Sequence, residues 1–317
     1  MSPDHNCTSV AVAAFYRFVP LDPLEPLQQE LLAFCQDLDL RGTILLAPEG
    51  INATVAGSPR AVQALLRELR SRDEFKDLAA KISHSDRQAF HRMKVRLKKE
   101  IVTMGVPGID PNREVGTYLD AEEWNDLIQQ PDVTLVDTRN RYEVQLGTFE
   151  GAIDPETDSF RDFPEWVAQN LDPDRNPRVA MFCTGGIRCE KATALLKNRG
   201  FKEVYHLNGG ILQYLEDTPR DKSRWNGECF VFDNRVTVDH ELNPGHHEIC
   251  FNCRMPLSEE DLNSPRYEKH VSCPHCYAGV TESRRASLKE RARQVALAEA
   301  RGQQHIGQVF EQGEHES

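Results

Sequence analysis

The sequence predicts a multidomain protein of mixed α/β class, and three observations support this prediction. Strand and helix patterns alternate over about the first 105 of its 317 residues, and they alternate again over residues 115–220. The remainder is irregular and carries two Cys-x2-Cys motifs. A chain of this length exceeds one ordinary domain. We therefore expect domains over residues 1–105 and 115–222, a linker over residues 106–114 and a cysteine-bearing segment with a helix over residues 223–317.

The N-terminal region contains six predicted elements in the order β-α-β-β-α-β. Apolar residues recur at helical spacing in two stretches, and short apolar strands surround them. The strands are expected at residues 10–18, 42–46, 51–55 and 92–103, and the helices at residues 24–38 and 58–70. This order is that of the ferredoxin-like, or acylphosphatase-like, α+β fold. Two prolines and two glycines in residues 105–111 indicate a linker after it.

The central region places a cysteine between a buried strand and a helix. The apolar residues 179–182 predict the strand, Gly185-Gly186 predicts a tight loop, and residues 189–199 are rich in helix formers. Backbone amides and the helix dipole at such a position stabilise an anion, and Arg188 adds a positive charge. We therefore expect Cys183 to be a reactive thiolate. A buried structural cysteine is the alternative, which the glycines and the arginine disfavour.

Residues 182–189, with the sequence Phe-Cys-Thr-Gly-Gly-Ile-Arg-Cys, resemble the active-site loop of the rhodanese family, whose cysteine carries a persulfide. Residues 133–139 are similar to the family's strand ending in Asp-x-Arg. Residues 147–153 are similar to its Gly-His-Ile-x-Gly-Ala segment, with Thr148 in place of histidine. The resemblance covers residues 115–220 and implies a mostly parallel sheet. The related phosphatases have one more residue between cysteine and arginine, which disfavours phosphatase activity here.

The rhodanese resemblance also implies a set of site residues. Cys183 would be catalytic, with Arg188 and the loop amides around its sulfur. Cys189 would lie in the first helical turn and either resolve a disulfide or simply pack. The residues expected to contact the substrate in this domain are Asp137, Arg139, Thr184, Gly185 and Gly186.

Four cysteines near the C-terminus predict a metal site. They are Cys250, Cys253, Cys273 and Cys276, in the pattern C-x2-C-x19-C-x2-C. Two close pairs supply four thiolates for a tetrahedral zinc ion, and a closed site of this kind is structural. A dithiol redox pair or an iron–sulfur cluster is the alternative. His270 and His275 could substitute as ligands.

The distribution of charge points to a nucleic acid, although the net charge is −12. Residues 81–105 hold seven basic and two acidic residues, a local charge of +5. In the predicted last strand Arg92, Lys94, Arg96 and Lys98 alternate with apolar residues, so that one face would present four cations. Such a face suits an RNA backbone. The alternative is an edge strand that lysines guard against aggregation.

Composition and motifs indicate the cellular location and the cofactors to expect. The mean hydropathy of −0.56, the lack of a membrane-length apolar stretch and an N-terminus without a signal pattern predict a cytoplasmic protein with no membrane partner. No Gly-x-Gly-x-x-Gly or Walker loop supports a bound nucleotide cofactor. The sequence leaves the oligomeric state open.

The whole chain resembles the rhodanese-related tRNA uridine hydroxylases. The resemblance spans about residues 10–290 and depends on residues 45–54, 94–102, 181–191 and 251–254. It implies hydroxylation of wobble uridine 34 of tRNA, not DNA, to 5-hydroxyuridine, with molecular oxygen and an unidentified reductant as co-substrates. Two other classes stay open: a sulfurtransferase that passes a persulfide from Cys183 to cyanide or a thiol, and a non-catalytic RNA-binding or sulfur-carrier adaptor.

Overall fold

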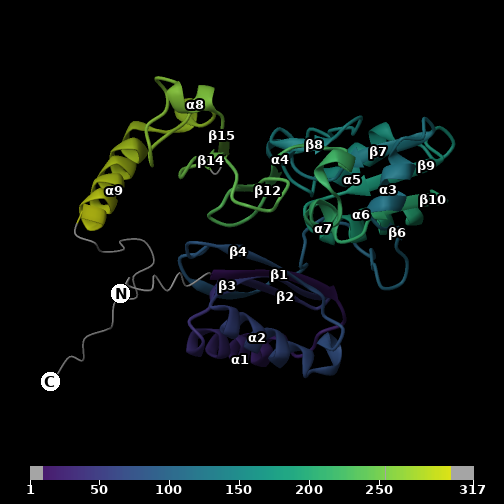
Figure 1. Ribbon diagram of the computed structural model, residues 1–317, viewed down its shortest axis with the longest axis horizontal. Helices are drawn as coiled ribbons and strands as arrows, with labels where there is room; N and C mark the ends of the chain where they lie inside the picture. Colours follow the sequence, from purple (N-terminus) through teal and green to yellow (C-terminus); the bar gives the residue numbers. More distant parts are fainter. Residues whose placement is uncertain (1–9, 254, 301–317) are drawn as a thin grey trace, which may run out of the picture. The chain divides into compact units, whose positions relative to one another are not determined.

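The structure is a computed structural model that describes residues 10–253 and 255–300 (Figure 1). The chain divides into two compact units, Met1–Gly245 and His246–Ser317, which are described separately below. The first unit holds two sheets with their helices, and the second holds the four-cysteine region. Within the described residues, no helix has the length and apolar character needed to cross a membrane.

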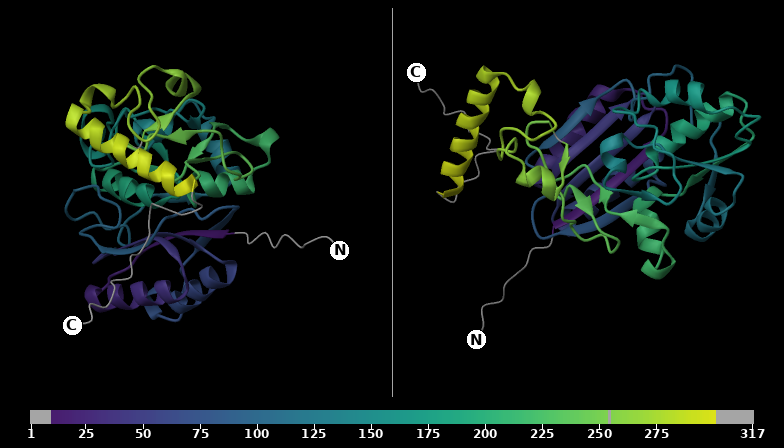
Figure 2. Two further views of the ribbon diagram at one scale, coloured as in Figure 1. Left: turned by 90° about the vertical axis from the view of Figure 1, so that its left-hand side faces the viewer. Right: turned by 90° about the horizontal axis from the view of Figure 1, so that it is seen from above.

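The N-terminal part of the first unit is a five-stranded sheet with two helices on one face, as Figure 2 shows. The strands lie in the order β4-β1-β3-β2-β5, in which only β5 runs parallel to its neighbour, β2. They are β1 (Val10–Phe18), β2 (Arg41–Ala47), β3 (Gly50–Gly57), β4 (Ala80–Ser85) and β5 (Met93–Leu97). The helices are α1 (Leu24–Asp37) and α2 (Pro59–Arg70), and a 3-10 turn follows at Asp73–Phe75.

Alternation along the strands gives this sheet two different faces. In β1, Ala11, Ala13 and Phe15 belong to the apolar core beneath the two helices. Their neighbours Ala14 and Tyr16 therefore point to the opposite face, because successive strand residues alternate. Helices cover one face only, and the other is left to form part of a cleft in the first unit.

The fourth strand of the ferredoxin-like order is β4 and not the predicted strand at residues 92–103. β4 pairs with β1, whereas β5 is an additional edge strand that ends at Leu97. The segment after β5 leaves the sheet because side chains satisfy its backbone: Glu49 accepts from the Ile101 amide at 2.7 Å, and Asn52 donates to the Ile101 carbonyl at 3.0 Å. The predicted strand is therefore correct in its first half only.

The central part of the first unit is a parallel sheet between two helical layers, as expected. Its strands lie in the order β6-β10-β9-β7. They are β6 (Thr117–Leu119), β7 (Val133–Asp137), β9 (Arg178–Phe182) and β10 (Glu203–Leu207). Apolar residues of α5 (Phe163–Asn170) and α6 (Ile187–Asn198) join the core on one face, and those of α3 (Ala121–Ile128) and α7 (Gly210–Asp217) join the core on the other. A short helix, α4 (Arg141–Val144), follows β7.

The first unit continues beyond the predicted domain end at residue 222. After a 3-10 turn at Arg220–Lys222, β11 (Trp225–Gly227) pairs with β8 (Gly147–Phe149), and β12 (Cys229–Phe230) pairs with β13 (Thr237–Val238). Trp225, Cys229 and Val238 are buried in the same core as α3 and α7. Residues 223–245 thus pack with the parallel sheet, and the unit ends at Gly245.

The second unit is small and irregular. It contains β14 (Glu248–Ile249), β15 (Pro256–Leu257), α8 (Glu259–Asn263), a 3-10 turn at Tyr277–Gly279 and α9 (Glu282–Ala300). Its apolar cluster is centred on Cys250, Leu257 and Cys273. α9 confirms the helix that the sequence predicts within residues 223–317.

Candidate functional site

Cys183 lies directly after β9, in the loop that leads into α6, as the sequence predicts. Its side chain is 1% exposed, and its Sγ accepts a hydrogen bond from the Gly186 amide at 3.2 Å. Burial alone would raise the pKa of the Cys183 thiol. Hydrogen bonds from the Cys189 thiol and from the amides of Cys189 and Arg188, together with the Arg188 charge, outweigh it and lower this pKa to about 6. These contacts therefore favour the thiolate form of Cys183.

Two glycines fix the shape of this loop. Gly186 has a φ of +97°, which L side chains rarely adopt, and its amide donates to the sulfur. Gly210, at the start of α7, has a φ of +68°, and a Cβ there would lie 2.5 Å from the Cys183 carbonyl oxygen. The amide of Ile211 donates to that same oxygen at 3.0 Å. Both positions therefore require glycine, for backbone conformation and for close approach.

The charge of Arg188 is held in a buried ion pair. Its Nη1 and Nη2 each lie 2.7 Å from a carboxylate oxygen of Glu143, a fully buried residue of α4. Burial would raise the pKa of Glu143, but the Arg188 charge lowers it below its ordinary value. Arg188 is thus a fixed element of the loop that lowers the pKa of Cys183 while it stays paired.

Cys189 lies in the first turn of α6, as predicted, and is fully buried. Its Sγ is 3.6 Å from Thr138 Oγ1 and also hydrogen bonds with Cys183. Burial and the neighbouring Cys183 charge raise the pKa of Cys189 well above its ordinary value. A thiol that keeps its proton can donate to the Cys183 thiolate, so the structure gives Cys189 a supporting contact in the site.

Asp137 and Arg139, which are expected to contact the substrate, pair with each other behind the loop. Both are fully buried, and Arg139 Nη2 lies 2.6 Å from Asp137 Oδ2. The same oxygen accepts from Thr148 Oγ1 at 2.9 Å, so the residue in place of the rhodanese histidine joins this pair. Arg139 also packs over the Trp225 ring, 5.0 Å from its centroid. We therefore assign the pair a structural role behind the loop.

A cleft of about 1090 Å³ within the first unit connects the loop to the open face of the N-terminal sheet. Cys183, Thr184 and Gly185 line it from the loop. The residues that line it from the open sheet face include Ala14, Tyr16, Asn52 and Thr54. Three exposed apolar side chains also line it: Ile82, Tyr118 and Phe232. The thiolate therefore faces a space large enough for a nucleotide, with two exposed aromatic rings on its wall.

The predicted basic strand lies at the edge of this cleft. Lys94 pairs with Thr43 and Arg96 with Leu45 in the β2–β5 register, and Thr43 and Leu45 both line the cleft. Because paired residues share a face of the sheet, the side chains of β5 extend the same face. Arg92, Arg96 and Lys98 are exposed, and Lys94 is half-buried.

The structure also brings to the cleft residues that the sequence analysis did not select. Glu190 accepts hydrogen bonds from Tyr16 at 3.0 Å and from Tyr118 at 2.7 Å. Lys81 donates to Gln213 Oε1 at 3.2 Å, and burial lowers its pKa to about 8 against the raising effect of nearby carboxylates. Only Glu190 lies in one of the motifs quoted for a family resemblance, and the contacts of the other four residues join distant parts of the chain.

Lys191, the next residue in α6, joins the two parts of the first unit. It is 2% exposed, and its Nζ lies 2.8 Å from Glu49 and 2.6 Å from Glu100. These contacts bring together residues 45–54, 94–102 and 181–191, three of the segments that carry the family resemblance. The ion triad, in which Lys191 is buried and the two carboxylates are partly buried, gives one charged residue of each segment a structural contact.

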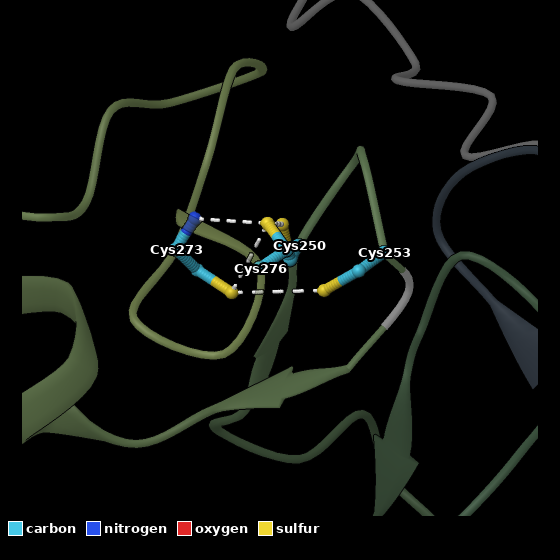
Figure 3. A group of neighbouring side chains, drawn as sticks. All are labelled: Cys250, Cys253, Cys273 and Cys276. Atoms are coloured by element: carbon cyan, nitrogen blue, oxygen red, sulfur yellow. Dashed lines mark hydrogen bonds between the residues drawn. The ribbon is translucent and has the colours of Figure 1, made fainter. Parts of the chain in front are cut away.

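In the second unit, the four predicted cysteines converge (Figure 3). Their sulfur atoms all lie within 4.8 Å of one another. The contacts Cys250–Cys276, Cys253–Cys273 and Cys273–Cys276 measure 3.9, 3.6 and 3.8 Å. Four sulfurs at about 2.3 Å from a tetrahedral zinc ion would be about 3.8 Å apart. His275 instead contacts Asp261 at 3.1 Å. The cluster could therefore hold a metal ion through four sulfurs.

Comparison with known proteins agrees with this architecture. The family profile of the UPF0176 acylphosphatase like domain matches residues 10–101, and that of the rhodanese-like domain matches residues 120–217. A curated protein of Teredinibacter turnerae, named tRNA uridine(34) hydroxylase, is 56% identical over 296 residues, which are 93% of this chain and 92% of that protein.

Two solved structures are also similar to part of the chain. The solution structure of a rhodanese-like domain from Anabaena sp. is 21% identical, with a TM-score of 0.30, over 36% of this chain and 80% of that domain. A structure from Rhodopseudomonas palustris, described as a possible tyrosine phosphatase, is 24% identical, with a TM-score of 0.28. The match covers 34% of this chain and 86% of that chain. At these TM-scores neither structure informs the function of this chain.

Proposed function

Since this chain belongs to the tRNA uridine(34) hydroxylase family, we propose that it hydroxylates the wobble uridine of cytoplasmic tRNA at carbon 5. The observation that carries the proposal is the Cys183 thiolate at the wall of a nucleotide-sized cleft. Molecular oxygen and a reductant are its co-substrates in this proposal.

The thiolate gives the reaction a nucleophile. Addition of Cys183 Sγ to carbon 6 of the uracil ring would move the electrons of the C5–C6 double bond toward carbon 5 and its carbonyl neighbour. Carbon 5 then becomes electron-rich, as hydroxylation at that atom requires. Arg188, the Cys189 thiol and the loop amides keep the sulfur ionised for this step.

The cleft offers contacts of the kind that single-stranded RNA uses. Phe232 is 57% exposed on its wall, and the ring of Phe230 supports it at 5.1 Å. An unstacked base gains stability by stacking on such a ring. Arg92, Lys94, Arg96 and Lys98, on the same side of the sheet, would contact phosphates of the anticodon stem-loop.

The four-cysteine cluster is proposed to hold one structural zinc ion. Cys250, Cys253, Cys273 and Cys276 would occupy all four tetrahedral positions, which would leave none for a substrate. The zinc would stabilise the second unit and take no part in the reaction.

A sulfurtransferase is the second candidate, because the same loop could carry a persulfide on Cys183. Incubation of the full chain with unmodified tRNA, a reductant and ¹⁸O-labelled oxygen separates the two. We expect one labelled oxygen atom on the wobble uridine by nucleoside mass spectrometry, and none with Cys183→Ala. Sulfur from thiosulfate in the base, or in a thiol acceptor, with no oxygen label would replace the hydroxylase proposal by the sulfurtransferase.

A further inference from the structure

We infer that Glu190, held by Tyr16 and Tyr118, is the acid–base residue that protonates a carbonyl oxygen of the uracil ring while Cys183 adds to carbon 6. The inference rests on the proposed function and assigns a second catalytic residue to it. It is carried by the contacts of Glu190, by its burial and by its position relative to the sulfur.

Three separate elements place this cluster. Glu190 is in the first turn of α6, Tyr16 is on β1 and Tyr118 is on β6. One carboxyl oxygen of Glu190 accepts from Tyr16 Oη at 3.0 Å, and the other accepts from Tyr118 Oη at 2.7 Å. All three side chains line the cleft that Cys183 also lines. The carboxyl group is therefore fixed in orientation at the wall of the substrate space.

The surroundings of Glu190 favour the protonated form. The side chain is 7% exposed, and both of its hydrogen-bond partners are neutral hydroxyls. The neighbouring cations have other partners: Arg188 contacts Glu143, Lys191 contacts Glu49 and Glu100, and Lys81 contacts Gln213. Burial, and then the charge of Cys183, raise the pKa of Glu190 against the two tyrosine hydrogen bonds. A carboxyl group whose pKa is raised and which lines a cleft is suited to general acid catalysis.

Gly186 contacts both the nucleophile, Cys183, and Tyr16, which holds Glu190. A Cβ at Gly186 would lie 2.8 Å from Tyr16 Oη, so the hydroxyl touches the loop at this residue. The amide of the same Gly186 donates to Cys183 Sγ at 3.2 Å. A flat six-membered ring near Gly186 would thus present one atom to the sulfur and a carbonyl oxygen to the carboxyl group.

The proposed step is balanced without an oxidant. The Cys183 thiolate forms a bond to carbon 6, and the electrons of the C5–C6 double bond form a new double bond between carbons 5 and 4. The electrons of the C4 carbonyl bond move to its oxygen, which takes the proton of Glu190. The products are a neutral enol adduct and the Glu190 carboxylate, and the reverse step restores both groups. Protonation of carbon 5 from solvent, followed by loss of its original hydrogen, exchanges that hydrogen with water.

This exchange allows the step to be measured without oxygen. The full chain is incubated anaerobically with tRNA that carries tritium at carbon 5 of the wobble uridine, and release of tritium to water is followed. We expect Glu190→Gln, which keeps the shape but carries no transferable proton, to slow the release about 100-fold or more. Tyr16→Phe combined with Tyr118→Phe should also slow it, because the carboxyl group loses both contacts that orient it.

A second tyrosine–glutamate pair, on β10 of the parallel sheet that also contains Tyr118, provides matched controls. Tyr205 Oη donates to Glu203 at 3.0 Å, but both residues lie outside the cleft lining. Glu203→Gln and Tyr205→Phe should leave tritium release unchanged. Iodoacetamide alkylation of Cys183 should proceed in Glu190→Gln within about twofold of the wild-type rate, which shows that the loop is folded and the thiolate intact.

The outcomes separate this inference from the proposed function. Wild-type protein that hydroxylates the wobble uridine but releases no tritium anaerobically would overturn the inference and leave the function standing. Equal tritium release by wild type and Glu190→Gln would also overturn the inference. So would a result in which Lys81→Met slows tritium release and Glu190→Gln does not. Wild-type protein that places no labelled oxygen on tRNA would remove the function, and the inference with it.

Discussion

At the scale of single residues, the site depends on a cysteine that is both buried and ionised. Burial of Cys183 opposes the charge, and short polar contacts within one loop overcome it. The Gly186 amide, the Cys189 thiol and the Arg188 guanidinium act on one sulfur atom. Arg188 is itself paired with Glu143. Stabilisation of the Cys183 thiolate is therefore divided between the Arg188 charge and the short polar contacts within the loop.

The pH dependence of alkylation tests this account. The rate of reaction of Cys183 with iodoacetamide should rise with pH and reach half its maximum near pH 6, because only the thiolate reacts and its pKa is about 6. Cys189→Ala removes a donor and should move the midpoint upward. Cys35→Ala, in the core of the N-terminal sheet, serves as the control and should leave it unchanged. A midpoint above pH 8 in the wild type would contradict the stabilised thiolate.

At the scale of elements, the edge strand β5 is the additional piece of the N-terminal sheet. Its apolar residues Met93, Val95 and Leu97 pack on the core beneath the helices. Its basic residues therefore extend the face that reaches the cleft, as the β2–β5 register shows. An edge strand with cations on that side can guard against aggregation and bind phosphate at once.

Salt dependence distinguishes the two roles of β5. If Lys94, Arg96 and Lys98 contact phosphates, replacing all three with Ser should weaken tRNA binding and reduce the slope of log affinity against log salt by about 2 to 3. The matched control replaces Arg60, Arg67 and Lys76, three exposed cations of α2 and the segment after it. Equal slopes for the two triple variants would show that the cations of β5 do not contact phosphates and serve only to protect an edge strand from aggregation.

Metal analysis tests the second unit. Purified protein should contain about one zinc per chain, and Cys250→Ser should lose it, because a structural site needs all four thiolates. Hydrogen exchange of residues 248–279 should become faster when the metal is lost, since the apolar cluster there is built on the same cysteines. Cys183→Ser should retain the zinc. Metal-free protein with four intact thiols would refute the site.

Features set by local patterns were predictable, and features set by distant contacts were not. The strand, loop and helix around Cys183 follow from an apolar run, two glycines and helix formers in one short segment. The sequence analysis did not predict β4 because four of the six residues in Ala-Lys-Ile-Ser-His-Ser are polar, and its strand is defined by pairing with the distant β1. Tyr16 and Glu190 are separated by 174 residues, so their contact leaves no local signal.

At the scale of the whole molecule, the first unit depends on a buried contact between its two sheets. Lys191 extends from α6 to two carboxylates beside the N-terminal sheet. Glu49 and Glu100 also bind the backbone of residues 101–105. The ion triad therefore ties the segment that connects the sheets to both of them.

Removal of Lys191 should destabilise the first unit. Lys191→Met leaves two partly buried carboxylates without their cation, at a cost of about 2 to 4 kcal/mol in the free energy of unfolding. Urea unfolding measures it, with Lys197→Met, nearer the end of the same helix, as a control within about 0.5 kcal/mol of wild type. Adding Glu100→Gln to Lys191→Met should restore part of the loss. A change below about 1 kcal/mol in Lys191→Met would show that the triad contributes little.

The contact between Tyr16 and Glu190 has a consequence for how such a protein changes over generations. A gene fragment that encodes only residues 120–217 would carry the cysteine loop into a new protein and leave Tyr16 behind. Tyr118 would be lost as well, so the inherited thiolate would meet a carboxyl group with neither of its orienting hydroxyls. A recombination break at residues 102–119 would divide the site, so we expect the regions on both sides of it to be inherited together.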